Sequence, residues 1–327
     1  MKATMRLALL AMLLVATLVA AGMAAAADKV SLRLNWYLGG LHTPFHLGVE
    51  RGYYRDEGID LTINEGRGSV RSVQIIGALG DTFGMADAGS LMLGAAKGVP
   101  IKSVFSLLGS SDFAIISLDE SGIRTPKDLE GKTVAVSPGD ALTQQFPAVI
   151  EANGLNKDRI KLVFMDPPAK PVAVMEKKVD ALLGGASDQF WLIKYKGFNP
   201  RMIKFADVGV DTVGMTINAH VDTLKDHPDM VRRFVKATIR SWEAAKQDPA
   251  AAVRAALKVK PDLNASSTED QLRTNLDELF SKNSKGQQVG YSSPEDWNHT
   301  LALMKKYRDM QTDLPATSFY TNDFMPK

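Results

Sequence analysis

The chain has 327 residues, 45% of them apolar and 23% charged, and it contains no cysteine. Without residues 1–27 it carries 37 basic and 37 acidic side chains, a balance that offers no electrostatic footprint for nucleic acid or an anionic membrane. The missing cysteine excludes a disulfide, a thiolate metal site, a cysteine nucleophile and a lipid anchor on an N-terminal Cys.

The first 27 residues have the pattern of a secretory signal peptide. Lys2 and Arg6 precede an apolar run of about fourteen residues from Leu7 to Ala20, and Ala25-Ala26-Ala27 supplies small residues for cleavage. The run is too short for a typical transmembrane helix. We therefore expect cleavage near Asp28 and a soluble periplasmic protein, with an uncleaved membrane anchor as the alternative.

Strand-like and helix-like segments alternate along the rest of the chain, which predicts an α/β protein with largely parallel sheets. In a first block, 28–117, strands are expected over 30–34, 59–64, 82–86, 101–106 and 113–117, with helices between them. A second block, 118–213, has expected strands over 132–136, 161–164 and 181–183 and helices over 141–153 and 171–178. A strand over 213–218 then precedes helices over 227–247, 268–280 and 294–310.

Polar and aromatic residues follow the first two expected strands, at the edge where open α/β sheets bind ligands. Asn35 can donate and accept hydrogen bonds, and Trp36 offers a flat apolar face, although a turn Asn and a core Trp are the plainer interpretation. The second strand leads into Glu65-Gly66-Arg67-Gly68-Ser69, where glycines admit a ligand to the backbone and a helix begins. The segment lacks the Gly-Lys-Ser/Thr ending of a phosphate loop.

Histidine and acidic residues near these strands have both functional and structural interpretations. His42 and His46 are one helical turn apart and would make half a metal site, but no third ligand is evident, so we expect no metal. His42 is instead a candidate for a hydrogen bond to ligand, with helix capping as the alternative. Asp87 and Ser90 follow the third strand and are typical of a helix cap, which is compatible with ligand contact.

Five segments in order carry a family resemblance: LNW at 34–36, GVERGYY at 48–54, EGID at 57–60, GMADAGS at 84–90 and DLEGKTVAV at 128–136. The chain resembles the solute-binding proteins of bacterial ABC importers, in the branch for thiamine-pyrimidine precursors, alkanesulfonates, taurine and nitrate. The resemblance implies the type II periplasmic-binding fold, with two α/β lobes and a ligand cleft between them. Lobe 1 would hold 28–117 plus 214–327 and lobe 2 118–213, with crossings near 117–119 and 213–216.

The family binds through two strand-to-helix turns of the second lobe, and the resemblance carries this role to 137–141 and 184–191. Trp191 would be the second face of an aromatic sandwich, with helix packing as the alternative. The expected ligand-binding residues are then Asn35, Trp36, His42, Glu65, Gly66, Gly68, Ser69, Asp87, Ser90, Ser137, Gly139, Asp140, Gly185, Ser187 and Trp191. Asp188 lies in the same turn, and no catalytic residue or cofactor is expected.

The resemblance implies a monomer that captures a small solute and delivers it to an inner-membrane ABC permease with its ATPase. Asn35, Trp36, Glu65 and Trp191 favour a flat nitrogen-containing ring, such as a pyrimidine. Sulfonate, taurine or nitrate remains an alternative, supported by Arg67, Ser69, Ser90 and Ser137. Two further alternatives are a periplasmic sensory module and a pyrimidine-synthesising enzyme of the same fold, whose known members use pyridoxal phosphate and a cysteine-rich segment that this chain lacks.

Overall fold

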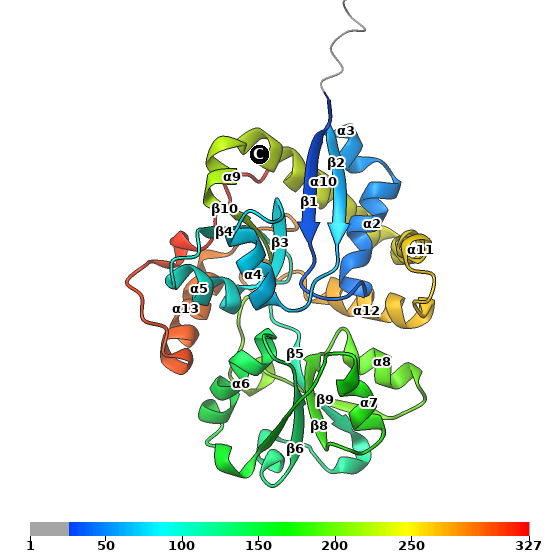
Figure 1. Ribbon diagram of the computed structural model, residues 1–327, viewed down its shortest axis with the longest axis vertical. Helices are drawn as coiled ribbons and strands as arrows, with labels where there is room; N and C mark the ends of the chain where they lie inside the picture. Colours follow the sequence, from blue (N-terminus) through cyan, green and yellow to red (C-terminus); the bar gives the residue numbers. More distant parts are fainter. Residues whose placement is uncertain (1–25, 327) are drawn as a thin grey trace, which may run out of the picture.

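The computed structural model describes residues 26–326, so the apolar run of the expected signal peptide lies outside the described residues. Each of two lobes is built on one five-stranded sheet flanked by helices (Figure 1). The first sheet has the order β2-β1-β3-β10-β4, and the second has the order β7-β6-β8-β5-β9. The α/β class and two-lobed architecture expected from the sequence are confirmed.

The first sheet contains β1 (Asp28–Arg33), β2 (Ile59–Asn64), β3 (Phe83–Asp87), β4 (Ile101–Ser106) and β10 (Met215–His220). Strand β1 is parallel to both β2 and β3, whereas β10 lies antiparallel between β3 and β4. The antiparallel strand is the one that arrives from the other lobe, so it enters the sheet from the opposite end.

The second sheet repeats this plan with β5 (Phe113–Leu118), β6 (Thr133–Val136), β7 (Lys161–Phe164), β8 (Ala181–Gly185) and β9 (Pro200–Lys204). Strand β5 is antiparallel to its neighbours β8 and β9, while β6 is parallel to β7 and β8. Both sheets are therefore mixed, and each takes one antiparallel strand directly after a crossing.

The pairing of β5 corrects one boundary. The sequence placed 113–117 in the first block, but every residue of β5 is buried in the second sheet. The first crossing therefore precedes β5 instead of following it near 117–119. A fully buried apolar run shows that a strand is in a core, but not which of two cores. The second crossing runs through Val213 into β10.

Nine α-helices surround the first sheet: α2 (Thr43–Glu50), α3 (Tyr53–Asp56), α4 (Ser69–Gly77), α5 (Ala88–Ala96), α9 (Val221–Asp226), α10 (Pro228–Gln247), α11 (Pro249–Val259), α12 (Ala265–Asp277) and α13 (Pro294–Arg308), among residues 26–326. The apolar face of α10 is buried on the sheet, and the Phe234 ring stacks on Phe83 of β3 with a centroid distance of 3.9 Å. The second lobe has α6 (Ala141–Ala152), α7 (Ala169–Met175) and α8 (Gln189–Tyr195).

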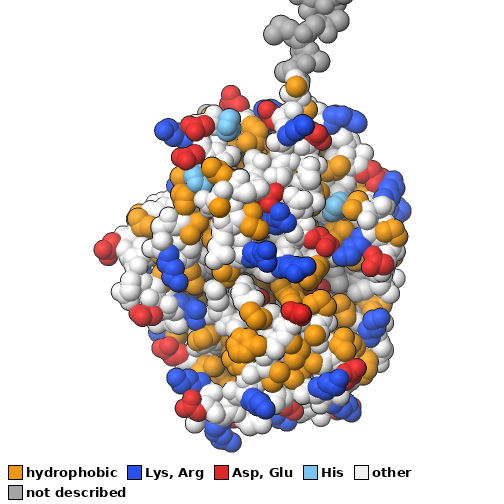
Figure 2. Space-filling model, viewed as in Figure 1, with side chains coloured by type: hydrophobic (Ala, Val, Ile, Leu, Met, Phe, Trp, Pro, Cys, Tyr) orange, Lys and Arg blue, Asp and Glu red, His pale blue; other side chains and the backbone are white. Residues whose placement is uncertain are grey.

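Helices near the lobe boundary bring the two halves together. The first-lobe helix α12 packs on α8 of the second lobe, and α13 packs on both α5 and α6 (Figure 1). Figure 2 shows basic and acidic side chains mixed over the visible face, while apolar side chains gather over the second lobe, below the boundary. No helix within residues 26–326 is both long and apolar enough to cross a membrane.

Candidate functional site

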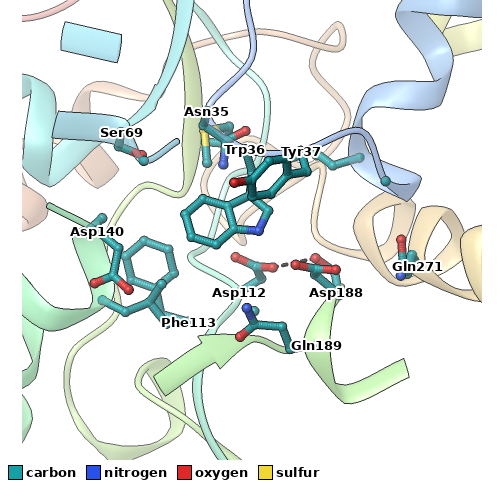
Figure 3. A pocket seen from close by; sticks show the side chains of 18 of the residues that line it. Asn35, Trp36, Tyr37, Ser69, Asp112, Phe113, Asp140, Asp188, Gln189 and Gln271 are labelled. Atoms are coloured by element: carbon teal, nitrogen blue, oxygen red, sulfur yellow. Dashed lines mark hydrogen bonds between the residues drawn. The ribbon is translucent and has the colours of Figure 1, made fainter. Parts of the chain in front are cut away.

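A cavity lies between the lobes and is lined by residues of both (Figure 3). Small-molecule sites occur preferentially at such interfaces between domains. The first lobe contributes the loop between β1 and α2, the start of α4, Met215 of β10 and Gln271 of α12. The second lobe contributes the start of β5, the start of α6, Lys170 of α7 and the turn from Gly185 to Gln189. The strand ends of both sheets thus face one cavity, as open α/β sheets favour.

The loop after β1 presents Asn35 with a fixed orientation. The Gly39 N–H donates to His42 Nδ1 at 3.1 Å, so the ring proton lies on Nε2, which is 3.0 Å from Asn35 Oδ1. Burial, followed by the charge of His46, lowers the pKa of His42 to about 3. A neutral His42 therefore occupies the amide oxygen of Asn35, and the Asn35 NH₂ group is left to donate.

Gln271 reaches the cavity because two backbones come close together. Its Oε1 accepts a hydrogen bond of 2.8 Å from the Gly40 N–H. A Cβ at Gly40 would lie 2.4 Å from the Cβ of Gln271, so any larger residue would separate the loop from α12. With its oxygen occupied, Gln271 also presents an NH₂ donor.

Aromatic and apolar side chains form much of the wall. Trp36 and Tyr37 are half-buried and meet edge to face, with a centroid distance of 5.9 Å and an interplanar angle of 73°. Phe113, Leu142 and Met215 also line the cavity. Figure 3 places the Trp36 ring above Phe113, Asp112 and Gln189. A flat ligand would find a π-face together with polar groups at its edge.

One ion pair is built into the floor of the cavity. Lys170 Nζ lies 3.1 Å from Asp140 Oδ2, and both side chains are at least 98% buried. The ammonium group also donates to Leu183 O at 2.7 Å and lies 5.9 Å from the Trp36 ring centroid. Asp140 caps α6 through the Thr143 N–H at 2.7 Å. The charge of Lys170 is thus matched before any ligand enters.

Two further carboxyl groups line the cavity without a comparable cation. Asp112 accepts from the hydroxyl of Ser187, and burial raises the pKa of Asp112. Burial, followed by the charge of Asp112, raises the pKa of Asp188 to about 6, while Lys170 opposes this shift. Gln189 Oε1 is buried without a hydrogen-bond partner among the described residues. This side of the cavity therefore offers acceptors and negative charge.

The expected site residues divide into two groups. Those that line the cavity are Asn35, Trp36, His42, Gly68, Ser69, Asp140, Gly185 and Ser187. Those that do not are Glu65, Gly66, Asp87, Ser90, Ser137, Gly139 and Trp191. Arg67 lies in a separate surface hollow with Arg33 and Arg71.

The first-lobe residues outside the cavity have structural contacts. Glu65 Oε1 accepts from the Leu38 N–H and from Lys260 Nζ, both at 2.8 Å, and so holds the loop that carries Trp36. A Cβ at Gly66 would lie 1.8 Å from Leu34 O. Asp87 caps α5 through the Ser90 N–H at 2.9 Å. These residues support the cavity from behind its wall.

The second-lobe residues outside the cavity are also engaged. Ser137 Oγ donates to Met165 O at 3.0 Å. Gly139 has φ +74° and its carbonyl oxygen would be 2.8 Å from a Cβ on Gly68, which shows how closely the lobes approach. Trp191 Nε1 donates to Thr274 Oγ1 at 2.8 Å, so Trp191 contacts the other lobe instead of forming a second ring face in the cavity.

Several residues of the lining were not expected from the sequence. Phe113 and the preceding Asp112 were not recognised because β5 was assigned to the other lobe, and Lys170 has the pattern of an ordinary helix lysine. Tyr37 and Gln189 adjoin expected turns, so proximity to Trp36 and Ser187 was an available signal. Gln271 belongs to a distant helix and has no local signal. Within residues 26–326 no group of three or more His, Cys, Asp or Glu residues is arranged to hold a metal.

The chain matches a known protein family. The model of the family described as "NMT1/THI5 like" matches residues 40–252, which is well over half of the chain. The chain belongs to the NMT1/THI5-like family. The matched range covers most of the cavity lining, from Gly40 through Met215, and leaves out Asn35, Trp36, Tyr37, Gly39 and Gln271.

Proteins similar to this chain in sequence have diverse names. A riboflavin-binding protein from Chloroflexus aurantiacus is 22% identical over 91% of this chain and 86% of its own length. A formylaminopyrimidine-binding protein from Halalkalibacterium halodurans is also 22% identical, over 91% of each chain. A 4-amino-5-hydroxymethyl-2-methylpyrimidine phosphate synthase from Uromyces fabae is 26% identical over 91% of this chain and 88% of its own. The relatives of this chain therefore include proteins named for binding and proteins named as enzymes.

Solved structures agree on the fold. The alkanesulfonate-binding protein SsuA from Xanthomonas axonopodis, bound to MOPS, superposes with a TM-score of 0.70 at 14% identity, over 91% of this chain and 99% of that one. The periplasmic nitrate-binding protein NrtA from Synechocystis has a TM-score of 0.67 at 10% identity, over 91% and 87%. At such identities the likeness shows the periplasmic-binding-protein fold alone.

Proposed function

We propose that this protein is the periplasmic solute-binding subunit of an ABC importer, and that its ligand is a flat nitrogen-containing ring of the aminopyrimidine kind. The observation that carries the proposal is an interlobe cavity lined by the Trp36 ring, by Asn35 and Gln271 with their amide oxygens already engaged, and by the carboxyl groups of Asp112 and Asp188. A heterocycle with ring nitrogens and amino groups needs both donors and acceptors around a flat face.

The charge of the cavity argues against the sulfonate, taurine or nitrate alternative. Its one lining lysine is paired with Asp140, and its histidine is neutral. Arg67, which supported an anionic ligand in the sequence, lies in another hollow. Sulfonate binding would place a permanent anion beside Asp112 and Asp188, where like charges repel.

The synthase alternative is weaker for the same reason. Pyridoxal phosphate would bring a phosphate into this acidic cavity, and the lining lysine is held by Asp140 and Leu183 O. The described residues therefore do not suit that cofactor. Binding proteins among the relatives, the periplasmic-binding-protein fold and the secretory pattern at the N-terminus support capture and delivery of a solute.

Closure of the lobes would supply the mechanism. The cavity is walled by both lobes, so a ligand that contacts both binds the closed form better and shifts the population toward it. The membrane permease with its ATPase would then recognise the closed form. No chemical change of the ligand is required.

The test is isothermal titration with the full chain expressed with its own N-terminus and purified from the periplasm. We expect binding of 4-amino-5-hydroxymethyl-2-methylpyrimidine or formylaminopyrimidine, and no binding of ethanesulfonate, taurine or nitrate. Riboflavin is titrated as well, as a flat ligand with a larger ring system. Mass spectrometry of the ligand after incubation should show it unchanged. Tight binding of an anion alone, or conversion of the pyrimidine, would contradict the proposal.

A further inference from the structure

We propose that the cavity selects a ligand that carries positive charge on a conjugated nitrogen group, such as an amidinium or a ring-protonated aminoheterocycle, and that Asp112 and Asp188 hold this group. The inference rests on the function proposed above and names the charge state of the ligand.

The charges of the lining do not cancel. Its charged side chains are Asp112, Asp140, Asp188 and Lys170. Lys170 and Asp140 neutralise each other at 3.1 Å. Since His42 is neutral, two carboxyl groups remain, and no lining cation is left for them. A neutral or anionic ligand would leave this charge uncompensated inside the closed protein, whereas a cation would match it.

The sheet register brings the two carboxyl groups to one place. Phe113 of β5 pairs with Gly185 of β8, so Asp112 and Asp188 lie on adjoining turns at the same sheet edge. The Ala186 N–H donates to Asp112 O at 2.8 Å and ties the turns together. A Cβ at Gly185 would lie 2.9 Å from Asp112 Oδ2, so the glycine admits the carboxylate.

The two carboxyl groups differ in their engagement. Asp112 is bonded to the Ser187 hydroxyl, which orients it, whereas the carboxyl group of Asp188 makes no hydrogen bond among the described residues. Figure 3 shows both below the Trp36 ring. A planar amidinium or aminopyrimidinium presents two parallel N–H groups, which match a carboxylate in the bidentate manner of arginine. The Trp36 face adds a cation–π attraction.

The charged groups around Asp188 give the site a pH dependence. Asp112 faces it from the start of β5, and Lys170 faces it from α7 with Asp140 as its partner. Beyond Asp112 lies the ion pair of Lys204 and Glu278. Because the pKa of Asp188 is raised to about 6, this carboxyl group is ionised at pH 7.5 and mostly protonated at pH 5. A ligand that stays cationic throughout should bind more weakly at the lower pH.

The experiment compares four probes by titration calorimetry on the full, processed protein at pH 7.5 and pH 5. Benzamidine, benzamide and benzenesulfonate share a flat ring but are cationic, neutral and anionic, while acetamidine is cationic without a ring. We expect benzamidine to bind at least tenfold more tightly than benzamide, and severalfold more weakly at pH 5. Benzenesulfonate should not bind.

Two variants locate the effect. Asp188→Asn should lower the affinity for benzamidine at least fivefold and leave the affinity for benzamide within twofold of the wild-type value. The retained benzamide binding shows that the variant is folded. Asp158→Asn removes an exposed carboxylate elsewhere in the second lobe and should change the affinity for neither probe. An equal loss of affinity for benzamidine and benzamide in Asp188→Asn would contradict the inference.

The outcomes separate this inference from the proposed function. Benzamide or benzenesulfonate binding as tightly as benzamidine would overturn the cation preference and leave flat-ring binding intact. Acetamidine binding as tightly as benzamidine would overturn the flat-ring ligand and support the cation preference. Failure of all four probes at millimolar concentration would overturn both.

Discussion

The indole Nε1 of Trp191 donates a hydrogen bond of 2.8 Å to Thr274 Oγ1, and so ties α8 of the second lobe to α12 of the first. One turn later, Tyr195 OH donates to Asp270 Oδ2, also at 2.8 Å. On the other side of the boundary, Gln145 Nε2 donates to Asp87 Oδ1 at 2.9 Å. These bonds join the lobes without lining the cavity, so they hold the lobes together independently of any ligand.

The first prediction follows from these contacts. Tyr195→Phe removes one interlobe hydrogen bond from an exposed position and should weaken ligand binding severalfold, because the lobes lose one of the contacts that join them. Titration calorimetry measures the loss, and small-angle scattering should show a more open ligand-free form. Tyr53→Phe removes a bond to Arg51 within the first lobe and is the matched control. Equal affinities in wild type and Tyr195→Phe would exclude the contact from closure.

The second prediction concerns Trp36. Trp36→Ala removes the aromatic face while the half-buried position leaves the core of the lobe unchanged. The affinity for the pyrimidine ligand should fall by about five- to 150-fold, because base–aromatic stacking contributes about 1–3 kcal/mol. Circular dichroism should be unchanged, and Trp36→Phe should retain part of the affinity. Unchanged affinity in Trp36→Ala would remove this residue from the site.

The third prediction concerns the stability of the ligand-free protein. The folded-state pKa of Asp188, about 6, is above its ordinary value of 3.8, so ionising this group opposes folding above pH 3.8. Asp188→Asn should therefore raise the free energy of unfolding by roughly 1–3 kcal/mol at pH 7. The gain should shrink toward zero as pH falls through 6 to 4. Urea denaturation at pH 4, 5.5 and 7 provides the measurement, and a gain that is the same at all three would contradict the assigned cause.

The fourth prediction concerns the buried ion pair. Lys170→Met leaves the Asp140 carboxylate buried without its cation and should destabilise the protein by about 3–5 kcal/mol. The double variant Lys170→Met/Asp140→Asn removes the charge and should recover part of this loss, since Asn still caps α6. Urea denaturation of the single and double variants measures both values. A double variant less stable than Lys170→Met would show that Asp140 stabilises the fold in some way other than its charge interaction with Lys170.

Local sequence patterns were sufficient to predict most helices and strands and the edge of each sheet that faces the cavity. The alternation of strands and helices predicted an α/β protein, and strand ends marked by Asn35, Gly68, Asp140 and Gly185 do face the cavity. This succeeds because the carboxyl ends of parallel strands share an edge, so position along the chain implies position in space.

Long-range pairing decided the rest. Strand β5 is a buried apolar run that either core could accept, and only its pairing with β8 and β9 assigns it to the second lobe. That assignment brings Asp112 beside Asp188. Trp191 illustrates the opposite case, since its place after β8 suggested a cavity face but the rotation of α8 directs it to Thr274.

The sequence by itself determined the family, the α/β class and the turns that form the cleft, because these depend on residue order and local backbone preference. Only the tertiary structure decided the charge of the cavity. The pairing of Lys170 with Asp140 and the neutrality of His42 depend on distance and burial, which are properties of the folded chain and not of spacing along it.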